Sequence, residues 1–257
     1  MDDAQLKAHA WAGAVDFQRL VGRHAPGATL HERDGVVASV VPGVQASILN
    51  AAIAREPQPQ SANATAAIAR LYEDSGVAKW GVWIDTDDNE TAATLEQQGL
   101  VLDSTPVLMG AELEHIAEPD DPEPPTIITA SLADLGRIND LAYGYSEPRI
   151  GPVLAGFPPG GPETSFHTYG SHADDGEIGS VAMIHDVDDD AFVTFVATIP
   201  NARGRGLATN LLKAALHEAK QRGQHTTTLQ ASRSGQGIYA GIGFRPLGEQ
   251  HLWERRP

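Results

Sequence analysis

The stretch of this chain best suited to chemistry is a short basic turn rich in glycine. Residues 203–206 read Arg-Gly-Arg-Gly and stand between a β-prone run and a helical run. Glycine lets a ligand approach the backbone closely, because it has no Cβ atom. The amides that open a helix lack intrahelical partners, and the helix dipole favours an anion beside them. The turn therefore predicts a site for a phosphate-bearing ligand, and its two guanidinium groups add further donors.

Other phosphate and metal motifs do not fit the chain. Thr209 stands where the dinucleotide fingerprint G-x-G-x-x-G needs its third glycine, and no P-loop pattern G-x-x-x-x-G-K-[ST] occurs. The histidines include no H-x-x-x-H or H-E-x-x-H pair, and we interpret His167 and His172 as loop residues, so no metal is expected. The absence of cysteine excludes disulfides, thiolate nucleophiles and cysteine-ligated metals.

Composition restricts the classes of partner. The chain has 257 residues, 41% of them apolar, which suits one large domain or two small ones with a real core. Its formal net charge of −16 disfavours nucleic acid and anionic membranes as partners. No apolar run approaches the roughly 18 residues of a membrane helix. The acidic start at Met1-Asp2-Asp3 does not resemble a signal peptide, so we expect a cytoplasmic protein.

Hydrophobic periodicity predicts alternating helices and strands in the first half. Apolar residues at helical spacing predict a helix over residues 6–24, and Asp34-Gly35 between two β-prone runs predicts a hairpin over residues 28–41. We expect further helices at residues 46–55 and 64–74 and a short helix at residues 90–98. Further strands are expected at residues 79–84, 100–102 and 106–113.

An acidic, proline-rich segment at residues 118–125 has no apolar periodicity and predicts a semi-rigid linker. We therefore expect one domain over residues 1–117 and another over residues 126–257. In the second half, strands are expected at residues 126–129, 165–170, 179–186, 192–199 and 226–230. Helices are expected at residues 131–142, 207–222 and 236–242. Residues 244–253 are expected to close the domain, and residues 143–162 form a Gly- and Pro-rich loop. The order predicts an α/β (α+β) fold with a mostly antiparallel mixed sheet flanked by helices.

The basic turn also carries a resemblance. Arg203-x-x-Gly206-x-Ala208, placed directly after residues 196–200, resembles the acetyl-CoA signature of the GNAT N-acetyltransferase superfamily. That signature is Arg or Gln, two residues, Gly, one residue, then Gly or Ala. Residues 229–232 and 237–244 resemble the family's next strand and its tyrosine-bearing helix ending in Gly-Phe. The resemblance covers about residues 126–253.

This resemblance implies an enzyme that transfers the acetyl group of acetyl-CoA to a primary amine of a small molecule or peptide by direct attack. It implies that the strand before the turn lines the pantetheine arm and that the turn holds the pyrophosphate. It gives Tyr239 the role of general acid toward the departing thiolate, which suits a phenol with a pKa near 10 only if it is aimed there. The implied cofactor-binding residues are Val196, Ala197, Thr198, Arg203, Gly204, Arg205, Gly206, Leu207, Ala208 and Thr209.

The base that takes the amine proton stays open. Residues 192–199 contain no carboxylate, whereas some family members carry one there. Removal through water and use of an already neutral amine are alternatives to a side chain. The side chains considered for this role are Asp190, Glu177, His185, Asp186 and Glu147.

The first half resembles the second in element order and predicts a degenerate GNAT-like domain. Residues 51–75 contain no glycine and no Arg-x-x-Gly-x-Ala, and Pro57, Pro59 and Gln60 stand where a pyrophosphate turn is expected. We therefore expect this half to bind no acetyl-CoA and to serve structure or one wall of the acceptor site. The alternative function for the whole chain is a catalytically weak acyl-CoA-binding regulator or scaffold.

Overall fold

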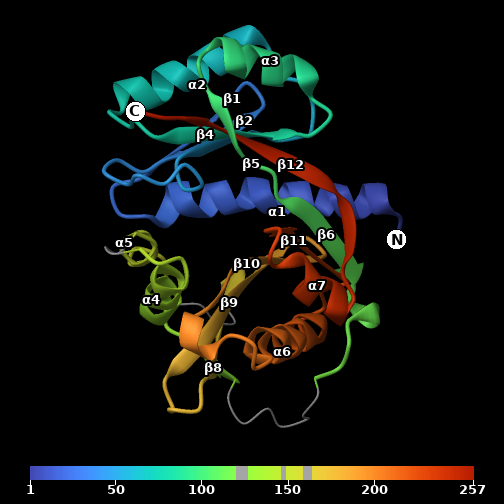
Figure 1. Ribbon diagram of the computed structural model, residues 1–257. Coiled ribbons are helices and arrows are strands. Elements are labelled where there is room, and N and C mark those ends of the chain that lie inside the picture. Colours follow the sequence, from blue (N-terminus) through green and yellow to red (C-terminus); the bar gives the residue numbers. More distant parts are fainter. Residues whose placement is uncertain (120–126, 146–148, 159–163) are drawn as a thin grey trace.

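The computed structural model describes residues 1–119, 127–145, 149–158 and 164–257 (Figure 1). The first half contains α1 (Asp3–His24), β1 (Thr29–Arg33), β2 (Val36–Val40), β3 (Ala51–Ala54), α2 (Ala62–Asp74), β4 (Trp80–Asp85), α3 (Asn89–Gln97), β5 (Val101–Ser104), β6 (Val107–Glu112) and the 3₁₀ turn η1 (Leu113–His115). The second half contains β7 (Ile127–Thr129), α4 (Leu132–Ala142), α5 (Gly151–Leu154), β8 (Phe166–His172), β9 (Ile178–Val187), β10 (Asp190–Thr198), η2 (Pro200–Ala202), α6 (Leu207–Gln221), β11 (Thr226–Ala231), α7 (Gln236–Ile242) and β12 (Arg245–Arg255).

The strands in the described residues form one twelve-stranded sheet. Its order is β1-β2-β3-β4-β12-β6-β11-β10-β9-β8-β7, and β5 pairs with β12 outside this path. Only β3 with β4 and β10 with β11 run parallel, and the other pairs are antiparallel. In Figure 1, α2 and α3 lie beside the first-half strands and α6 and α7 beside the second-half strands. The predicted fold class, a mostly antiparallel mixed sheet flanked by helices, is confirmed.

Two sequence-based expectations about single elements were wrong, and His167 and His172, interpreted as loop residues, lie in the strand β8. Residues 51–54, expected within a helix, form the strand β3, in which all four residues are buried. Alanine favours helices in isolation, but a short apolar run between β2 and β4 gains more from a sheet buried on both faces. The expected loop at residues 143–162 contains the short helix α5, whose Val153 and Leu154 enter the core.

The two halves exchange their last strands. β6, from the first half, lies between β11 and β12 of the second half. β12 begins beside β6 and then continues into the first half, where Gln250 to Arg255 pair with β4. Each half therefore takes one central strand of its sheet from the other. The division into domains at residues 117 and 126 stays a prediction, and residues 120–126 of the expected linker lie outside the described residues.

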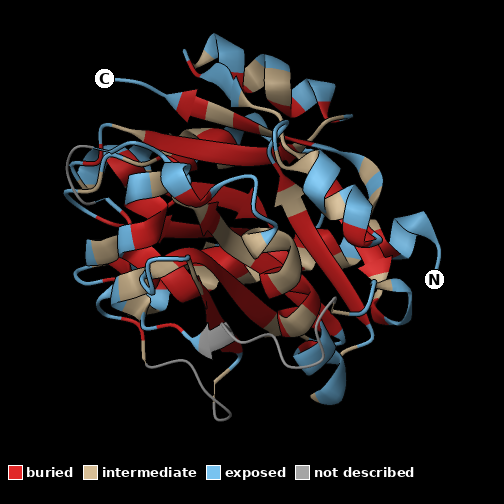
Figure 2. Ribbon diagram, turned by 60° about the horizontal axis from the view of Figure 1, so that its bottom comes forward, coloured by how far each residue is buried: buried red, intermediate tan, exposed pale blue. Residues whose placement is uncertain are grey.

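The long helix α1 lies between the two halves (Figure 1). It contacts β1, β2 and β3 on one side and β6, β9, β10, β11 and β12 on the other. Asp2 caps the start of α1 with a capping box. Its side chain accepts from the backbone amide of Gln5, and the Gln5 side chain accepts from the backbone amide of Asp2. The core cluster around α1 contains side chains from both halves, for example Trp83 and Met183. Figure 2 shows the same pattern, with the central strands largely buried and the outer helix faces exposed.

The contact between α1 and β10 is unusually close at Gly13. A Cβ atom added there would lie 2.3 Å from Cδ2 of Phe192, well inside contact distance. Phe192 is itself buried at 2% exposure, so its ring has little room to move. Glycine at this position therefore sets how closely the first-half helix can approach the second-half sheet.

We predict that Gly13→Ala destabilises the protein. Alanine is the better helix former by up to about 1 kcal/mol, but overpacking a filled core costs about 1–3 kcal/mol. The thermal midpoint, followed by circular dichroism, should therefore fall. Gly241→Ala in α7 is the matched control, because nothing lies within 4 Å of its added Cβ, and it should leave the midpoint unchanged or slightly higher. A Gly13→Ala protein as stable as the wild type would contradict the close contact.

Candidate functional site

The sheet of the second half opens in the middle of β10. β10 pairs in parallel with β11 only over its first residues, and the last pair in the described part of the chain joins Val193 to Leu229. On its other side β10 pairs with β9 as far as Thr194 and again from Ala197, with a register shift between them. The later residues of β10 thus have no partner strand on the side that faced β11. An extended ligand with amide groups can pair with such an edge.

The register shift is a β-bulge at Phe195 and Val196. Phe195 has a φ of 51°, which is rare for a bulky residue and costs conformational energy. Two neighbours hold it there: the Asn139 side chain donates to the carbonyl of Phe195 at 3.3 Å, and the ring of Phe17 packs edge-on at 5.6 Å. Asn139 also donates to the carbonyl of Leu135 at 2.8 Å, so its amide is fixed within α4. The bulge is therefore stabilised by contacts from both halves of the chain, Phe17 from the first and Asn139 from the second.

The predicted turn follows β10 directly. Gly204 and Gly206 both have positive φ angles, 77° and 75°, which explains why glycine is needed at both positions. Gly206 is the N-cap of α6, and no side chain caps this end of the helix. The amides of the first helical turn therefore remain available as donors. The residues of that turn are half-buried: Leu207, Ala208 and Thr209.

The two arginines of the turn use their side chains within the protein. Arg203 donates to the carbonyl of Thr198 at 3.0 Å and to the carbonyl of Ala142 at 2.6 Å. It therefore ties the end of β10 to the last turn of α4. Arg205 forms an ion pair with Asp174 in the turn between β8 and β9. The available donors toward an anion are thus mainly the backbone amides, with Arg205 able to exchange its exposed partner.

Tyr239 lies close to the opened strand. Its ring packs edge-on against Phe244 at 5.9 Å, and it packs against the same core cluster as Val196. Burial raises the pKa of the Tyr239 phenol well above its usual value, and the nearby Tyr143 adds to this shift. The phenol therefore stays protonated at neutral pH and can donate a proton or a hydrogen bond. Among the described residues, none hydrogen-bonds to its hydroxyl.

The first half lacks the same features at the equivalent place. β3 pairs without a register shift on both sides, with β2 and with β4. The carbonyl of Ala54, at its end, accepts from the indole of Trp11 at 2.8 Å. Ser61 caps α2 by accepting from the amide of Ala64, and the amide of Gln60 donates to the Thr91 hydroxyl. These groups therefore already have hydrogen-bond partners within the first half.

The acidic alternatives for the base are distant from the bulge or held by other groups. Asp190 precedes Val196 by six positions of an extended strand, which is roughly 20 Å. Asp186 forms a two-pronged ion pair with Arg222, at 2.8 and 2.9 Å, and also contacts His167. Glu177 lies in the exposed turn between β8 and β9. Glu147 lies outside the described residues.

His185 is the alternative nearest to the bulge. It lies on β9 opposite Phe192, on the face covered by α1, and is fully buried. Its Nε2 atom lies 3.1 Å from the carboxylate of Asp16 and 3.2 Å from the Ser165 hydroxyl. This contact joins α1 to the second half and explains the burial of the imidazole without a catalytic role.

Asp190 has a clear structural role that also predicts a pH dependence. Its carboxylate accepts from the hydroxyls of Thr226 at 2.7 Å and Thr228 at 2.5 Å. Burial raises its pKa from 3.8 to about 6, although the two threonine hydroxyls and His9 counteract this. The folded chain therefore binds more protons than the unfolded chain between about pH 4 and 6, and its stability falls as the pH rises through that window.

We predict that Asp190→Asn removes this part of the pH dependence, because the amide keeps an oxygen acceptor but does not ionise. The thermal midpoint of the variant minus that of the wild type should increase as the buffer is changed from pH 4 to pH 7. The measurement is thermal unfolding across this range at constant ionic strength. A wild type and a variant whose midpoints stay a constant interval apart would show that Asp190 does not titrate there.

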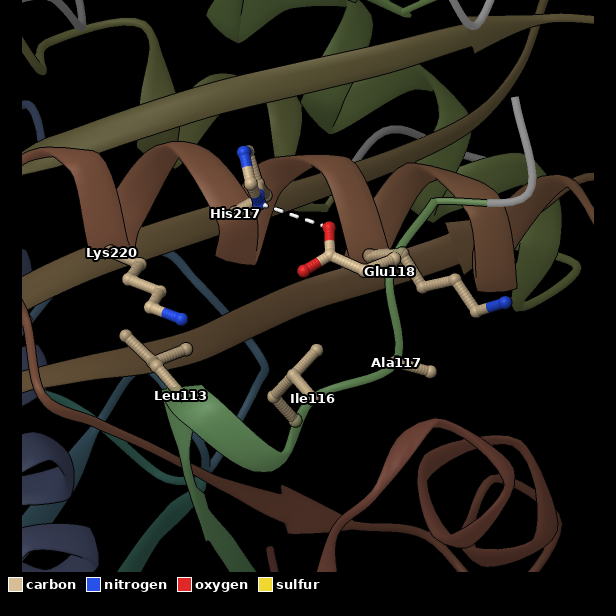
Figure 3. Close-up of a pocket in the computed structure, with 7 residues that line it drawn as sticks. Leu113, Ile116, Ala117, Glu118, His217 and Lys220 are labelled. Atoms are coloured by element: carbon tan, nitrogen blue, oxygen red, sulfur yellow. Dashed lines mark ion pairs between the residues drawn. The ribbon is translucent and has the colours of Figure 1, made fainter. Parts of the chain in front are cut away.

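A small hollow lies on the flank of α6, apart from the opened strand (Figure 3). One side comes from the basic residues Lys213, His217 and Lys220, and its other side is the segment after β6. Glu118 lies 3.4 Å from His217 and supplies a negative charge there. None of the residues expected to contact the cofactor lines this hollow.

Comparison with known proteins identifies the type of domain. A family model described as an acetyltransferase (GNAT) domain matches residues 164–253. This match includes β8 to β11, the turn, α6, α7 and most of β12. No curated protein matches the chain. Among the helices in the described residues, none is both long and apolar enough to cross a membrane.

Several solved structures share the whole fold. A GCN5-related N-acetyltransferase from Kribbella flavida is 18% identical with a TM-score of 0.67, over 96% of each chain. A GCN5-related N-acetyltransferase from Sphaerobacter thermophilus is 16% identical with a TM-score of 0.57, over 100% of this chain and 95% of that one. A tandem GNAT protein from the clavulanic acid biosynthesis pathway is 12% identical with a TM-score of 0.58, over 97% of this chain and 93% of that one.

The chain therefore contains a GNAT acetyltransferase domain over residues 164–253. Its second half carries the matched domain, and the chain as a whole has the fold of these GCN5-related structures.

Proposed function

We propose that this chain is an acetyl-CoA-dependent N-acetyltransferase that moves an acetyl group to a primary amine of a small molecule or peptide. The observation that carries the proposal is the parting of β10 from β11 after Val193, directly before a glycine turn that opens an uncapped helix. A free strand edge followed by free helix amides suits a ligand with an amide-bearing arm and a pyrophosphate. The feature lies within the half that matches the GNAT domain.

The free strand edge and the free amides at the start of α6 support acetyl-CoA as the ligand. Val196, Ala197 and Thr198 would pair with the pantetheine arm along the edge that β11 leaves. The amides of residues 204–209 would hold the pyrophosphate, with Arg203 fixing the turn and Arg205 exchanging Asp174 for a phosphate. Acetyl-CoA supplies an activated thioester as co-substrate. The first half, whose equivalent groups are satisfied, would bind none.

The protein's contribution to the reaction follows from the same groups. The acceptor amine attacks the acetyl carbonyl directly, and the C–S bond breaks. Because Phe195 and Val196 are unpaired with β9, their amides can stabilise the charge that develops on the carbonyl oxygen. Tyr239 would protonate the sulfur as it leaves. The amine proton passes to water, or the amine binds already neutral, since no free carboxylate in the described residues lies at the bulge.

We predict that Gly206→Val weakens acetyl-CoA binding by at least about tenfold, because a β-branched residue in the left-handed region is strained and 1.4 kcal/mol of lost binding is a factor of ten. The measurement is isothermal calorimetry, which should also give one site per chain for the wild type. Gly76→Val is the matched control: its φ is 67° and its surroundings are equally open, so it carries similar strain outside the site. Equal affinities in the two variants would count against the turn as the binding site.

We predict that Tyr239→Phe lowers kcat by about 10²-fold, the usual contribution of a general acid, and leaves the Kd of acetyl-CoA nearly unchanged. The readout is CoA thiol release with a good acceptor, together with calorimetry on the same preparation. Normal turnover in this variant would refute the acid role. A raised Kd with normal kcat would instead make Tyr239 a binding residue.

The alternative function is an acyl-CoA-binding regulator or scaffold that has lost its chemistry. The observation in its favour is that Asp186 and Asp190, the acidic alternatives nearest in sequence to the bulge, are held by other groups. Binding of acetyl-CoA without CoA release over a broad panel of amines would favour this alternative over the enzyme.

A further inference from the structure

Two tyrosines and an arginine form a stacked group just after α4. The rings of Tyr143 and Tyr145 lie 6.2 Å apart and 20° from parallel, and the guanidinium of Arg149 lies 4.4 Å from the centre of the Tyr145 ring. Tyr143 is 64% exposed and Tyr145 36% exposed, which is high for large aromatic side chains. The group is thus a flat aromatic surface that ends in a cation.

One buried carboxylate organises this group. Asp140, in the last turns of α4, accepts from the backbone amides of Arg149 at 3.1 Å and Ile150 at 3.0 Å, and more weakly from Gly151. Its own carbonyl accepts from the amide of Tyr145 at 3.0 Å. The backbone at Tyr145 and at Arg149 is therefore fixed from one residue. The group is held in place before any ligand arrives, which reduces the entropy cost of binding.

The stacked group lies beside the proposed reaction centre. Tyr143 directly follows Ala142, whose carbonyl accepts from Arg203 of the cofactor turn. Tyr143 is also close enough to Tyr239 to raise the pKa of that phenol. Tyr145 stacks on Tyr143, and Arg149 stacks on Tyr145. A molecule on this surface would therefore have one end near Tyr239 and the other near Arg149.

The charge of Arg149 is the second observation. No carboxylate in the described residues forms an ion pair with its guanidinium, although the chain has a formal net charge of −16. Asp140 lies close, but its oxygens accept from backbone amides. An exposed guanidinium stacked on an aromatic ring keeps its donors directed outward and can bind a carboxylate with two parallel bonds.

We propose that the stacked group selects the acceptor: an amine that carries a carboxylate, bound by Arg149, and an apolar or aromatic body that lies on Tyr143 and Tyr145. Aromatic and large apolar amino acids have this chemistry. The inference rests on the proposed N-acetyltransferase function and specifies its substrate class. Arg149 acts as a specificity residue and takes no part in the bond changes. A phosphate of the cofactor is the other anion that could reach this arginine, and the experiment separates the two sources.

The experiment compares phenylalanine, phenylalanine amide and phenethylamine as acceptors, with CoA thiol release as the readout. The wild type should prefer phenylalanine over both analogues that lack the carboxylate by about tenfold or more in kcat/KM, the usual contribution of a hydrogen-bonded ion pair. Arg149→Gln should lose this preference by raising KM for phenylalanine alone. Arg137→Gln, on the exposed side of α4 and paired with Asp134, is the matched control and should behave as wild type.

Three results would overturn the proposal. One is a wild type that uses the analogues without the carboxylate equally well, and another is an Arg149→Gln enzyme that keeps the preference for the carboxylate. The third is a large loss of acetyl-CoA affinity in Arg149→Gln, measured by calorimetry, because it would assign the arginine to a cofactor phosphate.

A direct binding measurement separates this proposal from the proposed activity. If acetyl-CoA binds but no amine releases CoA, the enzymatic function fails and the subsite is tested by titrating N-acetylphenylalanine into the CoA complex. Binding that is lost in Arg149→Gln would support the subsite even then. Equal binding to both proteins would overturn it.

Discussion

The structure depends on the place at which the parallel pair of β10 and β11 ends. Up to Val193 the two strands share a regular ladder, and beyond it the bulge at Phe195 turns the backbone of β10 away from that register. A parallel ladder that stops inside a sheet leaves polar groups that need another partner. The turn at residues 203–206 then carries the chain from this edge to the uncapped start of α6. The free donors and acceptors at this place therefore belong mainly to the backbone, and side chains such as Asn139 and Arg203 help to orient it.

The first half contributes by holding this arrangement from outside. Phe17 of α1 packs against the bulge residue, Gly13 lets α1 approach β10, and Asp16 pairs with His185 on the neighbouring strand. The exchange of β6 and β12 adds a central strand from each half to the sheet of the other. Loss of either half would thus expose sheet edges and apolar faces in the remaining one. In this way the first half can support the proposed site in the second half.

Sequence reasoning succeeded where the physics is local. The positive φ angles at Asp34-Gly35, Gly204 and Gly206 follow from glycine chemistry within a few residues, and the amphipathic stripe of α6 follows from its period. It failed at residues 51–54, because an alanine-rich run carries no period and its state depends on strands far along the chain. Asn139 was missed for the same reason: its bond to Phe195 joins residues 56 positions apart, and no local pattern marks it. The strand exchange also leaves no trace in hydrophobic periodicity. Apolar and polar residues alternate along a strand in the same way, whichever half it pairs with.

The most direct test of the central claim is backbone amide hydrogen exchange, measured residue by residue with and without acetyl-CoA. The free edge of β10 and the uncapped start of α6 should gain protection together, at residues 195–198 and 204–209. The amides of β3 and of the start of α2 should exchange at the same rate in both states. Protection of the first-half positions, or unchanged exchange at residues 195–198 in a protein that binds acetyl-CoA, would contradict the account.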